Sequence, residues 1–347
     1  LTNPVSNTFE KTQVAGYESL NWKDCYEKAA YYAGIIMGRN PDVSYGTYRL
    51  LSFDELWKKS GFDESEHMFS VRTRSADEEY GNGVHQWYCG MQDAGGVLQK
   101  GPWVGNRFHW YCLFDNEDYR ITKGVKHRFQ YDSQVKNGRG YYYPGTPEYK
   151  LMATGKNMDD VKVQEPVAPF NDGLTYTNSI SSNCLAFTTK YADVTDPTIG
   201  RTDAYWPFLR YADIVLIYAE AQCELNDGIS QDAIDALNDI RIRSNAKEAS
   251  VTGDGAIETK VELRSVIFEE RAKELAYEGD RRWDLLRWGI YLDVMNSLGG
   301  INEDGTRTPY DEGSINKRRE FRHLLYPLPS LEVSTNMAID KNNPGWN

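Results

Sequence analysis

The chain has 347 residues, of which 40% are hydrophobic and 26% are charged, and its formal net charge is −12. This composition is typical of an ordinary soluble globular protein, and the net acidity argues against a nucleic-acid partner, because binding a phosphate backbone draws on clustered Lys and Arg. The longest apolar stretch, residues 214 to 219, is far too short to span a membrane.

Residues 1 to 62 form the first segment, which carries helical periodicity and a break at residues 40 to 42, Asn-Pro-Asp. Short extended pieces are expected beside the helices of this segment. A short helix is predicted over residues 53 to 57.

Residues 63 to 205 have a different character, with frequent Gly, Pro, Asn and aromatic residues. The chain is therefore expected to turn often and to form short strands, such as residues 69 to 71, rather than long helices. A loop region of this length inside a compact protein is uncommon unless it is functional or disordered. Its aromatic content argues against disorder, so a functional loop region is the favoured interpretation.

From residue 206 to residue 288 the sequence predicts helices in pairs, which start a third segment covering residues 206 to 347. The first helix has apolar residues at the three-or-four spacing of one buried face, and Asn226-Asp227-Gly228 is expected to end it, with Gly228 able to take a left-handed conformation. Ser230 is placed to cap the second helix. The apolar positions are Ile214, Ile217, Tyr218, Ala221 and Leu225 in the first helix, and Ala233, Ile234, Leu237 and Ile240 in the second.

A second pair follows, because Leu263, Ile267 and Leu275 lie on one helix face. Gly279 is expected to end that helix, and Asp280 to cap a shorter one. After residue 288 the tail is irregular: Pro327 and Pro329 prevent a regular helix, and residues 330 to 333 are expected to start one short final turn.

Three strings together resemble the C-terminal half of SusD/RagB proteins, in which these segments occur in this order. They are LRYADIVLIYAEA at residues 209 to 221, FEERAKELAYEGDRRWDLLRW at 268 to 288, and LLYPLPSLEVSTNMAIDKNNPGW at 324 to 346. A helix pair whose first helix bears Tyr and Ala is also similar to a tetratricopeptide unit. The resemblance covers residues from about 190 to 346 and is weaker upstream.

The resemblance implies a mainly α fold of tetratricopeptide-like helical hairpins, with a large loop-rich insertion and a few short β-strands. It also implies an outward-facing lipoprotein of the outer membrane in a Bacteroidetes-type bacterium. Such a protein binds an oligosaccharide, uses no cofactor and passes its ligand to a TonB-dependent transporter barrel. Family members begin with a signal peptide, a lipidated Cys and further helices. None of these opens the present sequence, so we expect the N-terminal part and its lipid anchor to lie before Leu1.

A catalytic set is hard to find in the sequence. The five His and five Cys residues show no metal-binding spacing, and Cys223 is expected to be buried and inert. A glycan hydrolase would need two carboxylates beside the scissile bond. The candidates are Asp115, Glu117 and Asp118, or Glu269 and Glu270, but acidic residues are plentiful.

Two charged clusters have a simpler interpretation than a site. Residues 115 to 118 offer oxygen donors for calcium but lack the twelve-residue loop of a calcium hand, so a surface turn is favoured. Residues 269 to 271 and 280 to 284 are expected to form ion pairs at helical spacing, with Arg stems packed along Trp.

Aromatic residues in the loop region are the best candidates for a binding site. A sugar presents one face of C–H groups and a rim of hydroxyls, so a site for it needs flat rings and planar polar side chains. Trp87 and Trp103 have Gly neighbours that place them in loops, whereas any of these rings could instead belong to the core. The predicted ligand-binding residues are Gln86, Trp87, Tyr88, Trp103, Asn106, Arg107, Trp110 and Tyr142.

The sequence leaves three functions open. Non-catalytic capture of a glycan is the main prediction, and a glycan hydrolase that uses loop carboxylates is the first alternative. The second alternative is a pure interaction scaffold, in which the helix pairs hold a protein partner.

Overall fold

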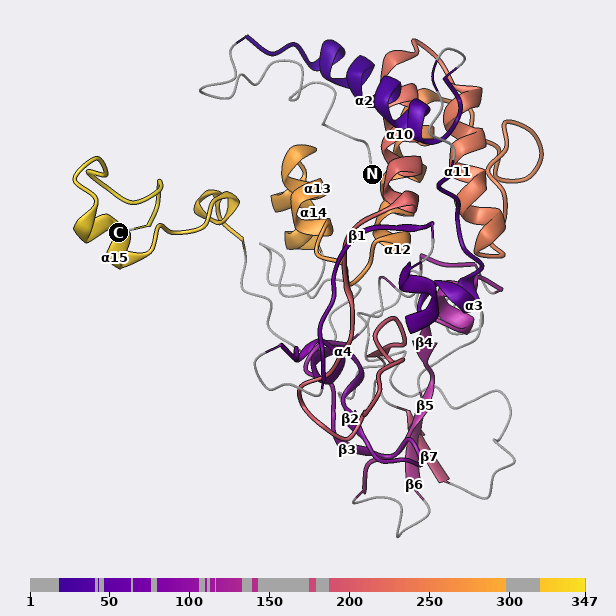
Figure 1. Cartoon of the computed structure of the whole chain (residues 1–347). Coiled ribbons are helices and arrows are strands. Elements are labelled where there is room, and N and C mark those ends of the chain that lie inside the picture. Colours follow the sequence, from indigo (N-terminus) through magenta and orange to yellow (C-terminus); the bar gives the residue numbers. More distant parts are fainter. Residues whose placement is uncertain are drawn as a thin grey trace.

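The computed structural model (Figure 1) describes residues 19–40, 43, 47–63, 65–75, 80–105, 110, 113–115, 117–132, 139–142, 175–178, 187–297 and 319–346. Helices gather at the top of the view in Figure 1, and short strands lie at the bottom. Within this part of the chain, none of the helices is both long enough and apolar enough to cross a membrane.

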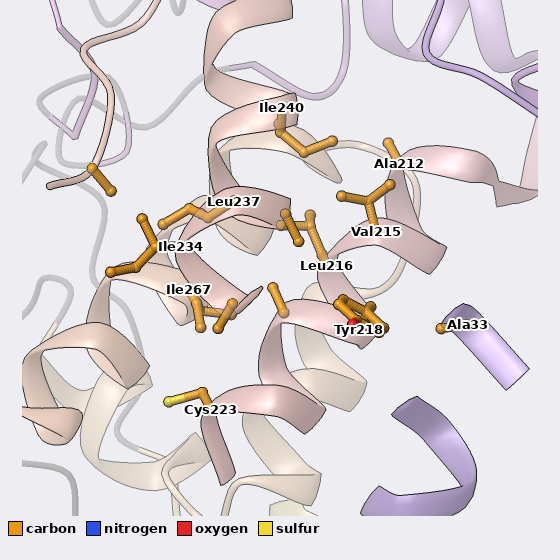
Figure 2. Close-up of a cluster of buried hydrophobic side chains, with 14 of the residues drawn as sticks. Ala33, Ala212, Val215, Leu216, Tyr218, Cys223, Ile234, Leu237, Ile240 and Ile267 are labelled. Carbon is orange, nitrogen blue, oxygen red and sulfur yellow. The ribbon is translucent and has the colours of Figure 1, made fainter. Parts of the chain in front are cut away.

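The helical part is built around α10 (Tyr211–Leu225), which packs against α2 (Trp22–Ile36), α11 (Gln231–Arg243) and α12 (Lys260–Glu274). Figure 2 shows side chains of these helices converging on one core. The predicted buried face of α10 is confirmed at Ile214, Tyr218 and Ala221, but the helix is also covered on its other sides, which the prediction did not include. Its buried residues include Ala212, Val215, Leu216, Ala219, Ala221 and Cys223.

Local signals explain how the α10–α11 hairpin forms. α10 ends at Leu225, and the hydroxyl of Ser230 accepts a hydrogen bond from the N–H of Ala233 at 3.3 Å, as predicted. The stripe of Ala233, Ile234, Leu237 and Ile240 is buried, which confirms the predicted face. Gly228 does not take a left-handed conformation, so that expectation was wrong.

The second pair consists of α12 and α13 (Arg281–Arg287), with α14 (Tyr291–Ser297) after it. Leu263, Ile267 and Leu275 are buried as predicted. α12 ends at Glu274, before Gly279, which has φ +102°. Asp280 occupies the N-cap position of α13 but its side chain makes no capping hydrogen bond, because its backbone is already helical.

The expectation of helix from residue 206 onward was wrong at its start. Residues Trp206–Arg210 form β9, which pairs antiparallel with β1 (His67–Val71). Pro207 disfavours helical backbone in the residue before it, so Trp206 is extended and α10 begins only at Tyr211. The Trp206 ring stacks on Tyr191, with ring centroids 5.6 Å apart and planes 8° apart.

The loop region contains only short elements among its described residues, as expected, and its longest helix is α4 (Val84–Cys89). β2 pairs with β3, β4 with β8, and β6 lies between β5 and β7. The remaining elements are α3 (Phe53–Leu56), η1 (Lys59–Asp63), β2 (Met91–Gln92), β3 (Leu98–Lys100), α6 (Tyr119–Thr122), β4 (Val125–Lys126), β5 (Arg128–Phe129), β6 (Arg139–Tyr142), β7 (Thr175–Asn178) and β8 (Phe187–Thr188).

The C-terminal residues 319 to 346 form an exposed module that contains η2 (Phe321–Leu324) and the predicted last turn, α15 (Ser330–Thr335). Arg282 anchors the module to α13 by donating to the carbonyl oxygen of His323 at 2.9 Å. The indole N–H of Trp346 donates to the carbonyl oxygen of Arg322 at 2.9 Å, so the module closes on itself.

A buried network of ion pairs joins the loop region to the helices. Arg210 contacts Glu66 at 2.6 Å and Glu278 at 2.7 Å, and Lys190 contacts Glu278 at 2.6 Å. Arg120 contacts Asp118 at 2.7 Å and Glu270 at 2.5 Å, and Arg243 contacts Glu274. Such pairs hold their partners in place, because removing one would leave the other charged and buried.

The signature string at residues 268 to 288 supplies much of this network. The expected pairing at helical spacing is present, for example between Glu269 and Lys273 at 2.6 Å. Most of the pairs, however, link residues far apart in the sequence. Arg stems do pack along a Trp ring, but the ring is Trp288, with the Arg287 guanidinium carbon 4.7 Å from its centroid.

Candidate functional site

Trp87 and Trp103 form a pair of exposed indoles that the backbone holds together. The N–H groups of Trp103 and Val104 both donate to the carbonyl oxygen of Trp87, at 2.9 and 3.0 Å. The exposed fractions are 48% for Trp87 and 75% for Trp103. We call these two residues the tryptophan platform. Two large exposed rings on backbone segments that are hydrogen-bonded to one another offer flat apolar surface to a ligand.

The helix α4 presents Trp87 because its opposite face is buried. Val84, His85 and Cys89 lie inward at helical spacing, and the Nδ1 atom of His85 is 2.7 Å from the carbonyl oxygen of Tyr191. Burial raises the pKa of the Cys89 thiol to about 12, so this side chain is an inert packing group. Trp87 therefore faces outward on a helix that is fixed from below.

Two glycines let the chain approach α4 closely. A Cβ atom added at Gly83 would lie 3.2 Å from the Trp87 indole, so the ring lies against this glycine. Gly90 has φ +76°, and an added Cβ there would lie only 2.5 Å from the carbonyl oxygen of Lys100. Gly90 thus permits the β2–β3 hairpin to return beside α4 and to bring Trp103 to Trp87.

Three other predicted site residues lie in packed positions. The Tyr88 ring contacts Tyr191 and Tyr277, at centroid distances of 5.3 and 5.6 Å, and burial raises the pKa of its phenol. The Trp110 indole donates to the carbonyl oxygen of Ala272 on α12 at 2.8 Å. Both contacts favour a packing role for these rings. The half-buried Gln86 side chain lies against Gly200, and its part in binding stays a prediction.

Asn106 and Arg107 lie outside the described residues, and so does the side chain of Tyr142, whose backbone belongs to β6. The sequence interpretation missed Val104, which is 41% exposed and shares the Trp87 carbonyl oxygen with Trp103. In the sequence, the only indication that Val104 belongs to this site was its position between Trp103 and Gly105.

Four of the five carboxylates considered for a hydrolase, those of Asp115, Asp118, Glu269 and Glu270, are engaged in structural contacts, whereas Glu117 is exposed. Asp118 and Glu270 are buried and both contact Arg120. Burial opposes ionisation of Glu270, but the guanidinium groups of Arg120 and Arg241 outweigh it and lower its pKa to about 2. A general acid needs a raised pKa instead. Asp115 accepts a hydrogen bond from the N–H of Lys247 at 3.1 Å.

Metal ligands do not converge in the described part of the chain, where no group of three or more His, Cys, Asp and Glu side chains is placed to hold an ion. The favoured surface turn holds only in part. Asp115 and Glu117 are exposed and the N–H of Asp118 donates to the carbonyl oxygen of Asp115 at 3.3 Å, but Asp118 itself is buried and its carboxylate binds Arg120.

Comparison with known proteins finds relatives in sequence and in structure. SusD-like protein P2 of Formosa agariphila is 33% identical over 142 residues, which cover 40% of this chain and 25% of the relative. A SusD homolog from Bacteroides thetaiotaomicron has a TM-score of 0.61 at 20% identity, covering 96% of this chain and 61% of that one. Surface glycan-binding protein A from the same organism, in complex with laminarihexaose, has a TM-score of 0.54 at 19% identity, covering 90% and 58%.

The chain thus spans about a quarter of the length of the curated relative and about three-fifths of the two solved structures. The structural likeness establishes the mainly α fold of tetratricopeptide-like hairpins, as predicted. The sequence pattern of the SusD family matches residues 92–346, which is most of the chain and includes all three signature strings. A match of this extent, together with the fold, means that the chain belongs to the SusD family.

Proposed function

We propose that this protein binds a glycan without cleaving it, at the outer surface of the outer membrane, and delivers it to a TonB-dependent transporter barrel. In this proposal the protein is attached to the membrane by a lipid anchor. The observation that carries the proposal is the tryptophan platform, in which two indoles are exposed and their backbone segments are joined through the Trp87 carbonyl oxygen. A solved relative of the same fold, in complex with laminarihexaose, supports the choice of a glycan.

The platform suits capture followed by release. An indole face stacks on the C–H face of a sugar ring and gains dispersion and apolar burial without any bond-making group. Such contacts are broad and individually modest, so a ligand can dissociate toward a second protein. The loop carboxylates Asp115 and Asp118 are held by Lys247 and Arg120, which favours binding over hydrolysis.

The test is calorimetric titration of the purified protein with laminarihexaose and with β-1,4- and α-1,4-linked oligosaccharides. Trp103→Ala and Trp87→Ala should each weaken binding by about 1–3 kcal/mol, which is about 5- to 150-fold in Kd. The matched control is Trp283→Ala, because Trp283 on α13 is 59% exposed and lies outside the platform.

A Kd and a stoichiometry that both platform substitutions leave unchanged would reject the tryptophan platform as a site. A large fall in Tm for both variants would instead show that these rings stabilise the fold.

Two alternative functions predict different results. A hydrolase would turn over one of these oligosaccharides, and a single Asp or Glu substitution would abolish the turnover. A pure scaffold would bind no glycan yet would still associate with its transporter in a pull-down from outer membranes.

A further inference from the structure

A groove of about 490 Å³ lies on the helical part of the molecule, between residues 48 to 52 and the neighbouring ends of α10 and α11. In Figure 1, α11 is at the upper right and α4, which carries Trp87, is at the lower left, so this groove is separate from the tryptophan platform. Its volume is within the range of small-ligand sites, about 300–1,000 Å³. Its lining includes Tyr48, Arg49, Leu50, Tyr211, Asp239 and Ile242.

The apolar part of the groove is aromatic and rigidly supported. Tyr48 is half-buried and stacks on the buried Tyr211, with planes 18° apart and centroids 6.4 Å apart. Ile242 adds an aliphatic side chain that is 60% exposed. A ring held by a second ring behind it loses little conformational freedom when a ligand covers it.

The polar part offers one acceptor and one donor. The Oδ2 atom of Asp239 accepts a hydrogen bond from Arg39 at 2.7 Å, while the side chain stays about half exposed. Its Oδ1 atom accepts no hydrogen bond from the described residues. Arg49 is exposed and forms neither a hydrogen bond nor an ion pair within the described part of the chain. Its guanidinium therefore remains available to a ligand.

We propose that this groove is a second carbohydrate site, which takes one or two rings of a neutral glycan. The Tyr48 ring and Ile242 would cover the C–H face of a sugar, a sugar hydroxyl would donate to Asp239, and Arg49 would donate to a second hydroxyl. A neutral sugar fits because its hydroxyl groups can use both the Asp239 acceptor and the Arg49 donor, whereas a carboxylate group could use only Arg49. The choice of a sugar rests on the proposed function, but the site, its location and its residues do not depend on the platform.

The experiment is titration with laminarihexaose and the same β-1,4- and α-1,4-linked oligosaccharides, now read for stoichiometry. The unsubstituted protein should bind two molecules of a short oligosaccharide. Tyr48→Ala should reduce this to one, and Trp103→Ala should also leave one. The double variant should bind none. Tyr32→Ala is the matched control, since Tyr32 on α2 is also an exposed tyrosine and should not alter the stoichiometry.

Asp239→Asn provides a second test that keeps the shape of the groove. It should weaken the groove site about tenfold while Tm changes little, because the lost ion pair with Arg39 is exposed. A single site that disappears in Trp103→Ala and is unaffected by Tyr48→Ala and Asp239→Asn would overturn the groove and leave the proposed function intact. A single site lost in Tyr48→Ala alone would support the groove and reject the platform. Absence of glycan binding in every titration would overturn both.

Discussion

Arg210, at the end of β9, contacts Glu66 at 2.6 Å, and both side chains are buried. Arg210→Leu would remove the nearest counter-charge of Glu66 and one of the two counter-charges of Glu278, and both carboxylates would stay buried. We expect a loss of about 3–5 kcal/mol in the free energy of unfolding, because an uncompensated buried charge is costly. Urea denaturation measures the loss.

The control for this substitution is Lys123→Ala. Lys123 pairs with Asp54 at 2.7 Å, but both side chains are exposed, so the expected loss is about 0–1 kcal/mol. If the two variants lost similar stability, the buried network would not be what joins the loop region to the helices.

Gly90→Ala should damage the tryptophan platform without touching either indole. The added Cβ would meet the Lys100 carbonyl oxygen in a backbone conformation with φ +76°, so we expect a loss of about 1–3 kcal/mol in stability and weaker glycan binding. Gly228→Ala is the control, because nothing lies within 4 Å of its added Cβ and its φ is not positive. Unchanged glycan affinity in Gly90→Ala would mean that the hairpin does not position Trp103.

Trp110→Phe separates packing from ligand contact. The substitution keeps an aromatic ring but removes the hydrogen bond from the indole to Ala272, so stability should fall by about 1 kcal/mol while glycan affinity stays the same. Thermal unfolding and the calorimetric titration measure the two quantities side by side. A fall in affinity at unchanged Tm would restore Trp110 to the binding site.

Asp280 should make the free energy of unfolding depend on pH between about pH 4 and pH 6. Burial and the nearby carboxylates of Asp213 and Glu278 raise its pKa from the ordinary value of 3.8 to about 6. The folded protein therefore holds this proton more tightly than the unfolded chain does. The resulting destabilisation is absent below about pH 4, grows between pH 4 and 6, and is complete above pH 6.

Asp280→Asn removes this effect and keeps a residue that is also suited to an N-cap. Because the side chain is partly exposed, we expect a gain of only about 1 kcal/mol at pH 8 and no gain at pH 4. Urea denaturation at the two pH values tests this. Equal gains at both would show that the carboxyl group titrates normally.

Features that depend on a few neighbouring residues could be predicted from the sequence. The cap at Ser230 and the stripe from Ala233 to Ile240 are of this kind, because a cap and a helical period involve only one turn of chain. The missing cap at Asp280 could not be predicted, because it depends on the backbone angles that precede α13. The strand at residues 206 to 210 depends on a distant partner, β1.

The candidate site was predictable to a similar degree. Glycine neighbours predicted loops for Trp87 and Trp103. The prediction was wrong for Trp87, which lies on the helix α4, but Trp103 lies outside the helices and strands, and both side chains are exposed. Nothing in the sequence indicated that the N–H of Trp103 binds the Trp87 carbonyl oxygen, since that contact needs the intervening hairpin. Tyr88 is an aromatic residue of the same glycine-rich stretch as Trp87, so the sequence does not distinguish the two. Tyr88 is one position further along α4, however, and its ring therefore faces Tyr191 and Tyr277.

The ionic contacts between Glu66, Lys190 or Arg120 and the helices have a consequence for how the polypeptide can be divided. Neither the loop region nor the helical part can neutralise its own buried charges. Without residues 63 to 205, Glu274 would lose Arg120 and Glu278 would lose Lys190. Arg210 would lose Glu66. Residues 63 to 205, which carry the indoles, are therefore not expected to be removable from the fold. This region and the helices should unfold in a single cooperative step. Substitutions on the outward surface of the loops would leave this shared charge balance undisturbed.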